Sequence, residues 1–110
     1  MIPSNVRVFV CPEPQDMRRG FDRLALTVRA EMGGDPRTGA FFVFVSRRGD
    51  RLKLLWWDQT GYALLYKRLH RATTQAPRAT DASQRAIEID QRSLAALLRG
   101  VPRDAARKRS

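Results

Sequence analysis

Cysteine, long apolar runs and export signals are scarce or missing in this chain, and each absence excludes a class of protein. Cys11 is the single cysteine among 110 residues, which excludes an internal disulfide and a metal cluster built on cysteines. The longest apolar run, at residues 40–45, is far too short to cross a bilayer. Residues 1–5 show no basic patch followed by an apolar stretch, so we expect no export signal and a cytoplasmic protein without a membrane partner.

Acidic residues are also few relative to basic ones. The chain has 11 Asp and Glu residues against 21 Lys and Arg residues, and its formal net charge is +10. Such an excess in a small protein causes self-repulsion and indicates a polyanionic partner, with nucleic acid as the first choice. The alternative is drift in an arginine-rich genome, which fits the presence of only three lysines, Lys53, Lys67 and Lys108. We favour contact with nucleic acid.

The sequence contains enough apolar residues for one folded domain. A length of 110 residues with 43% hydrophobic residues allows a single compact core and is too short for two. We expect this domain to span residues 1–102. Residues 103–110 hold four basic residues and one acid, and we expect them to form a basic disordered tail.

The first third of the chain has the pattern of a strand followed by a helix. Alternating valines predict a strand over residues 6–10, which Pro12 and Pro14 end. Asp16 is the expected N-cap of a helix with one apolar face, although Gly20 leaves open a start near residue 20. That face would carry Met17, Phe21, Leu24, Val28 and Met32. We expect the glycine pair at residues 33–34 to end the helix.

The middle of the chain predicts an antiparallel meander. Residues 41–45 and 52–57 have the composition of strands, and they are joined by a turn at residues 47–50 in which Gly49 can adopt a positive φ. A second turn at residues 58–61 leads to residues 62–69. For this last segment the β-prone Tyr62, Leu64 and Tyr66 favour a strand over a short helix.

The last third predicts a loop, a short strand and a helix. Residues 73–84 are polar and form a loop, with room for a short edge strand at its start, and residues 87–89 form a strand. Asp90 is the expected N-cap of a final helix that Gly100 and Pro102 end. Its apolar face carries Leu94, Leu97 and Leu98. The predicted fold class is α+β: a small single domain with an antiparallel β-meander, one helix near the N-terminus and one short helix near the C-terminus.

Residues that could carry catalysis lack visible partners. His70 has no neighbour to orient it as a general base, and Cys11 is better interpreted as a small, half-buried apolar residue. Four carboxylates could gather around a divalent cation: Asp16, Asp22, Asp50 and Asp58. Each has a simpler interpretation, as a helix cap, as an ion-pair partner of neighbouring arginines, or as a turn residue. We therefore expect no enzymatic activity, no metal and no cofactor.

Basic and aromatic residues are interleaved between residues 47 and 71. Arginine binds phosphates through two parallel hydrogen bonds, and exposed aromatic faces stack on unpaired bases. Trp56 and Trp57 are neighbours in a predicted strand, so at least one must point into the core. We therefore assign the nucleic-acid contacts to basic residues. They are Arg47, Arg48, Arg51, Lys53, Lys67 and Arg68, with Arg18 and Arg19 as a second patch.

Two sequence blocks together resemble a known family. Residues 16–25 read DMRRGFDRLA, and residues 47–58 read RRGDRLKLLWWD, preceded by FVF at 42–44 and followed by GY at 61–62 and YKRL at 66–69. In this order and separation they resemble the TnpB accessory protein, the second open reading frame product, of the insertion-sequence sixty-six family. The resemblance covers roughly residues 1–102.

The resemblance implies a protein that is encoded with a transposase and needed for efficient transposition, without the DNA-cleaving residues. The leading hypothesis is a non-catalytic accessory factor that binds DNA, the transposase of the same element, or both. One alternative is an adaptor that docks the transposase and has only incidental affinity for nucleic acid. Another is a metal-dependent nuclease that uses Asp16, Asp22 or Asp58.

Overall fold

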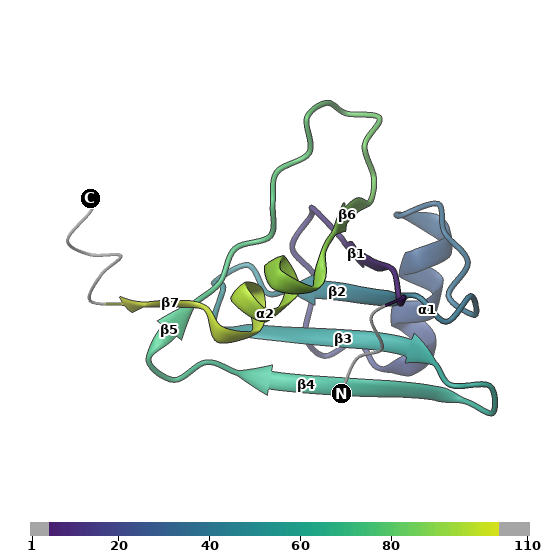
Figure 1. Cartoon of the computed structure of the whole chain (residues 1–110), viewed down its shortest axis with the longest axis horizontal. Helices are drawn as coiled ribbons and strands as arrows, with labels where there is room; N and C mark the ends of the chain where they lie inside the picture. Colours follow the sequence, from purple (N-terminus) through teal and green to yellow (C-terminus); the bar gives the residue numbers. More distant parts are fainter. Residues whose placement is uncertain (1–4, 104–110) are drawn as a thin grey trace.

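A computed structural model of the chain describes residues 5–103, which form a five-stranded sheet with a helix on each face (Figure 1). The strands of this sheet lie in the order β4-β3-β2-β1-β6. Their bounds are β1 Val8–Val10, β2 Phe41–Val45, β3 Arg51–Trp57, β4 Tyr62–Arg68 and β6 Ile87–Ile89. The helices are α1 Phe21–Ala30 and α2 Gln91–Arg99, and a separate pair of strands joins β5 Ala72–Thr73 to β7 Val101–Pro102.

The sheet has an apolar core on both faces. Phe42 and Phe44 of β2 pack with Leu24 and Val28 of α1 on one face. The alternating residues Phe41, Val43 and Val45 pack with Leu94 of α2 on the other face. All five residues of β2 are buried, because side chains of a strand point to opposite faces in turn and both faces are covered. In Figure 1, α2 lies in front of the sheet and α1 behind it.

The predicted meander is confirmed as β2, β3 and β4, with antiparallel pairing throughout. Residues 62–69 were expected to favour a strand over a helix, and they form β4. The sheet also contains one parallel pair, because α1 carries the chain from β1 back to the same end of the sheet for β2. β6 then pairs antiparallel with the other side of β1. The fold is a small α+β domain whose sheet is mostly antiparallel.

The hydrogen bonds at the two ends of the β3–β4 ladder fix which residues bond across it. The Leu69 amide donates to the Asp50 carbonyl (2.7 Å), and the Asp58 amide donates to the Gly61 carbonyl (3.0 Å). Directly opposite residues of an antiparallel ladder alternate between hydrogen-bonded and non-bonded pairs. The pair Arg51–Arg68 is therefore non-bonded, and in such pairs the two side chains lie closest together. The backbone amides of residues 62, 64, 66 and 68 point away from β3.

Of the two predicted starts of α1, only the later one is correct. The helix begins at Phe21 with Gly20 as its N-cap, so the expected cap at Asp16 is wrong and the alternative start near residue 20 is confirmed. The Asp16 carboxylate instead accepts a hydrogen bond from the Arg18 amide and closes a turn before the helix. Met17 is buried ahead of the helix, whereas Phe21 is 47% exposed and does not belong to the buried face.

The ends of the two helices were predicted with different success. Helix α1 ends at Ala30 with Glu31 as its C-cap, ahead of the predicted glycine pair, although Gly33 adopts the expected positive φ of 67° just beyond it. The Asp90 carboxylate accepts a hydrogen bond from the Ser93 amide at the N-terminus of α2, and Gly100 caps its C-terminus with a φ of 73°. The expected short strand at the start of the 73–84 loop is β5.

Part of the predicted domain organisation lies outside the described residues. The basic tail expected at residues 103–110 is described only at Arg103, so the prediction of disorder there is not tested. No helix among residues 5–103 is long and apolar enough to cross a membrane.

Candidate nucleic-acid interface

The turn between β2 and β3 presents two arginines to solvent. Arg47 and Arg48 are exposed, and the turn closes behind them where the Gly49 amide donates to the Ser46 carbonyl (3.0 Å). Gly49 adopts a φ of 74°, a conformation that glycine accepts at little cost. The Ser46 hydroxyl donates to the Asp50 carboxylate (3.2 Å). This carboxylate therefore braces the turn while both guanidinium groups stay free to bind an anion.

A second loop fixes the position of this turn. The Thr74 amide donates to the Gly49 carbonyl (2.7 Å). A Cβ atom added to Gly49 would lie 2.4 Å from the Thr74 carbonyl oxygen, so only glycine allows this close approach. The contact brings the predicted loop at residues 73–84 beside the turn. Arg78 of that loop lines the same depression as Arg47 and Arg48, a neighbour that the sequence did not suggest.

Two shallow depressions flank the turn. The first has a volume of about 440 Å³ and lies between the turn and the loop that carries Thr74 and Arg78. The second, of about 320 Å³, lies between the turn and the segment before α1, and Arg18 and Arg51 line it. Arg47 and Arg48 line both depressions. The structure thus brings basic residues from three separate segments of the chain to one end of the molecule.

Arg51 and Arg68 extend this basic surface across two strands. They are directly opposite each other in the β3–β4 ladder, in a non-bonded pair. Like charges in this arrangement destabilise a sheet. Within residues 5–103, no ion pair or side-chain hydrogen bond neutralises the guanidinium group of Arg47, Arg48, Arg51 or Arg68. We call these four residues the arginine cluster.

Lys53 does not belong to this surface, which corrects its assignment as a phosphate contact. The residue is only 6% exposed and lies on the α1 face of β3. Its ammonium group donates a hydrogen bond to the Arg19 carbonyl (2.7 Å) and lies 4.7 Å from the centre of the Tyr66 ring. Lys53 therefore holds the segment before α1 against the sheet.

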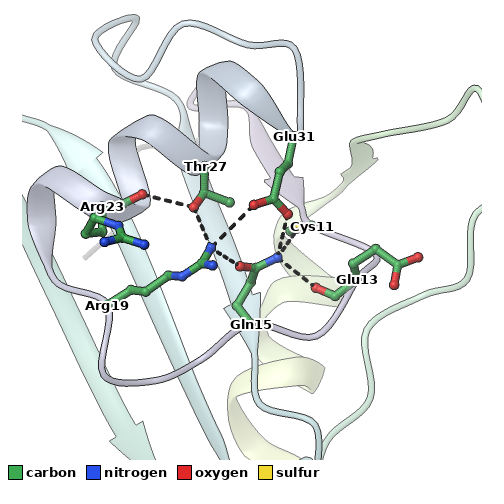
Figure 2. A network of polar contacts seen from close by, with 7 residues as sticks. All are labelled: Cys11, Glu13, Gln15, Arg19, Arg23, Thr27 and Glu31. Atoms are coloured by element: carbon green, nitrogen blue, oxygen red, sulfur yellow. Dashed lines mark hydrogen bonds and ion pairs between the residues drawn. The ribbon is translucent and has the colours of Figure 1, made fainter.

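Arg19 is likewise engaged inside the protein (Figure 2). Its Nη1 atom donates to Gln15 Oε1 (2.8 Å) and Thr27 Oγ1 (3.1 Å), and it forms an ion pair with Glu31 (3.3 Å). Gln15 is buried and donates in turn to Glu31 Oε1 (3.1 Å). The network joins the segment before α1 to the body of α1. Arg19 therefore holds the segment that carries Arg18 against α1, and its guanidinium already has three side-chain partners.

Arg18 and Lys67 remain exposed but have partners. The Arg18 side chain is 92% exposed and pairs with Asp16 at 2.7 Å, and this hydrogen-bonded pairing holds the pKa of the Asp16 carboxyl far below its usual range. Lys67 lies on the opposite face of β4 and donates to the Leu98 carbonyl near the C-terminus of α2 (2.6 Å). A cation there interacts favourably with the helix dipole. Both residues can add charge to a contact, but Arg18 is already paired with a carboxylate and the Lys67 ammonium already donates to a carbonyl.

Neither tryptophan offers an open stacking surface. Trp56 packs against Phe41 on the α2 face, with ring centres 5.0 Å apart. Trp57 packs edge-on against Tyr62 (5.0 Å), and the Arg37 guanidinium covers it at 4.6 Å. The expectation that at least one tryptophan points into the core is met by Trp56. Trp57 is only half-buried, but Arg37 occupies one face of its ring and Tyr62 packs against it edge-on.

The possible catalytic groups are dispersed. Cys11 is buried, and this burial is the main cause of the raised pKa of its thiol. His70 is exposed. In the described part of the chain, no three His, Cys, Asp or Glu side chains gather as a metal site would require. The ion pair expected for Asp22 is also wrong, since none of the ion pairs of residues 5–103 includes it.

One family model and two relatives match the chain. The sequence model of the IS66 Orf2-like proteins matches residues 6–108. The uncharacterized protein y4hO of Sinorhizobium fredii (strain NBRC 101917 / NGR234) is 41% identical over 103 residues, which cover 92% of this chain and 87% of that protein. Protein y4jC of the same strain is 39% identical over 62 residues, 56% of this chain and 53% of that protein. No solved structure matches the chain.

Proposed function

Since the chain belongs to the family of IS66 Orf2-like proteins, accessory proteins of transposition, we propose that it serves transposition by binding the DNA backbone with its arginine cluster. The observation that supports this contact most strongly is the direct pairing of Arg51 with Arg68, beside the two exposed arginines of the turn. The pairing lowers the stability of the free protein and becomes favourable once a phosphate lies between the two guanidinium groups.

Backbone binding fits the composition of this surface better than base reading does. Side chains that read bases hydrogen-bond to base edges from a helix or ribbon inserted into the major groove. Here the basic residues come from a turn, two strand ends and a loop, and all of them except Arg68 line shallow depressions. Such a surface follows a phosphate backbone, and phosphate contacts orient a protein on DNA without specifying sequence. The transposase would then supply the sequence recognition.

The test is a DNA titration with two variants that remove equal charge. The Arg47→Ala, Arg48→Ala double variant removes two residues of the arginine cluster. The control double variant Arg29→Ala, Arg37→Ala removes two arginines near the opposite end of the β2–β3 hairpin. Fluorescence anisotropy would measure the affinity of each protein for a duplex from an element end and for a scrambled duplex.

We expect the turn variant to lose about 1–3 kcal/mol of binding free energy on both duplexes, because two charge-assisted contacts disappear. The control should retain nearly wild-type affinity. Both variants should keep a wild-type circular dichroism spectrum. Within residues 5–103, Arg47 and Arg48 have no ion pair or side-chain hydrogen bond to lose, and the contacts of Arg29 with Asp35 and of Arg37 with the Trp57 ring are made by exposed arginines at the surface. Equal losses in the two variants would contradict the proposal, because the affinity would then reflect net charge and no particular surface.

The second element of the proposal is a contact with the transposase of the same element, which rests on membership of the family. A pull-down of the transposase with this protein, performed with and without nuclease, separates a direct contact from one bridged by DNA. We expect retention to persist after nuclease treatment and to persist with the Arg47→Ala, Arg48→Ala variant. Loss of the transposase on nuclease treatment would refute the direct contact and leave the DNA contact untouched.

A further inference from the structure

The longest unpaired edge of the sheet is β4. The strand order leaves two edges, β4 with seven residues and β6 with three. Within residues 5–103, no strand pairs with the outer side of β4, which forms the lower border of the sheet in Figure 1. The backbone amides and carbonyls of residues 62, 64, 66 and 68 point outward along this edge, as the alternation of the β3–β4 ladder requires.

The first five residues of this edge lack the usual protection against pairing with another strand. Natural edges are kept apart by charged residues, prolines, bulges or short length. The first five residues of β4, at positions 62–66, carry no charge and no proline, and only Lys67 and Arg68 follow them. Leu65 is 40% exposed and Tyr66 is 52% exposed. The edge is therefore long, largely uncharged and partly apolar.

We propose that two copies of this chain pair antiparallel through the outer edges of β4, with Leu65 of each copy meeting on the two-fold axis. In this register Leu64 lies opposite Tyr66 of the second copy, and Tyr62 lies opposite Arg68. All four outward-facing residues of each strand then find hydrogen-bonding partners. A shift of the axis to residue 64 or 66 would leave one end of the strand unpaired.

The distribution of charge favours an antiparallel pairing of two copies over a parallel one. Lys67 and Arg68 are both at one end of β4, so a parallel pair would place four cations together. The antiparallel pair places Arg68 beside an aromatic ring, Tyr62, and Lys67 beside Ala63. A cation beside an aromatic ring is attracted by it, whereas like charges directly opposite repel. The uncharged leucine at position 65 meets its own copy at the centre.

The dimer does not depend on the proposed DNA contact, but it would reinforce it. Residues bonded across a sheet lie on the same face, so the Arg51–Arg68 pairs of both copies would lie on one face of a continuous sheet. Six residues along the strand separate Arg68 of one copy from Arg68 of the other, which is about 20 Å. One duplex could contact both clusters, and this bivalence raises affinity without new contacts.

The test measures the molecular mass of the full chain in solution without DNA. Sedimentation velocity at physiological and high salt should show a concentration-dependent species of twice the 12.6 kDa chain mass. High salt matters because a net charge of +10 on each copy opposes association. A wild-type protein that stays monomeric up to high micromolar concentration overturns the proposal and leaves the edge to a strand from another protein.

Two substitutions at the axis test the register. Leu65→Lys and Leu65→Glu should each produce a monomer, because residue 65 would face an identical charge. An equimolar mixture of the two variants should recover the dimer. In the proposed register residue 65 lies opposite residue 65 of the second copy, so a mixed pair places Lys opposite Glu. The matched control is Leu26→Lys, a 58% exposed leucine on α1, which should remain dimeric. A mixture that stays monomeric, or a control that also dissociates, contradicts the proposed interface.

Discussion

The arginine pair between β3 and β4 makes a specific prediction about stability. Arg51 and Arg68 lie directly opposite each other and have no acidic partner among residues 5–103. The substitution Arg68→Glu replaces a like-charge pair with an opposite-charge pair and changes no buried residue, since Arg68 is exposed. We therefore expect the variant to be more stable than the wild type.

The magnitude follows from measured cross-strand pairs. An opposite-charge pair contributes roughly 0.2–1 kcal/mol, and a like-charge pair destabilises. Exchanging one for the other should raise the free energy of unfolding by about 1 kcal/mol. For a chain of this length that corresponds to an increase in Tm of about 4 °C. The gain should fall as salt is added, because salt screens exposed charges. Arg68→Gln removes only the repulsion and should show about half the gain.

The assay is urea and thermal unfolding of the three proteins at one fixed protein concentration, at low and high salt, with DNA affinity measured in parallel. We expect stability and DNA affinity to change in opposite directions, as happens where a site retains unfavourable charge for the sake of binding. The reasoning would be refuted if Arg68→Glu were no more stable than Arg68→Gln at low salt. A gain that did not depend on salt would also contradict it.

Three further predictions concern the stability of the fold. Gly49→Ala should destabilise the protein by about 2–3 kcal/mol in urea unfolding, because the new Cβ meets the Thr74 carbonyl oxygen and the positive φ adds strain. The control is Gly39→Ala, where φ is 90° but the space is open; it should cost about 1 kcal/mol. Lys53→Met should lose about 1–2 kcal/mol of stability by leaving the Arg19 carbonyl without its donor, while the salt dependence of DNA binding stays unchanged. Arg7 lowers the pKa of Glu88, and the hydrogen bond from the Ser93 amide lowers the pKa of Asp90. Both interactions therefore stabilise the folded state above about pH 4. Stability should therefore fall as the pH drops through these lowered values, and Glu88→Gln should make the decline measured by thermal unfolding shallower.

Local chemistry explains why much of the fold could be predicted from the sequence. The Asp90 cap and the Gly49 turn depend on residues within a few positions of one another, and both are present as expected. The strands of the meander follow from β-branched and aromatic runs between turn residues. The prediction of a helix cap at Asp16 was wrong because this carboxylate accepts a hydrogen bond from the Arg18 amide and closes a turn. Turns of this kind compete with helix capping for aspartate.

Long-range contacts explain what the sequence did not reveal. The placement of β1 between β2 and β6 depends on pairs separated by tens of residues. The burial of Lys53 could have been predicted from one feature, its place on the same strand face as the buried Leu55. A strand that is buried on both faces obscures that pattern. No sequence pattern predicted the position of Arg78, because the hydrogen bond between Thr74 and Gly49 is a long-range contact that brings its loop beside the turn.

The central claim, a DNA contact made by the arginine cluster, is tested most directly by the salt dependence of DNA affinity. Each phosphate that a cation neutralises contributes about 0.9 to the slope of log affinity against log salt concentration. For each bound copy, four arginines therefore predict a wild-type slope of about −3 to −4. Arg47→Ala, Arg48→Ala should reduce its magnitude by about two per copy, while Arg29→Ala, Arg37→Ala leaves it unchanged. A turn variant that keeps the full wild-type slope would contradict the account, because its two arginines would then contact no phosphate.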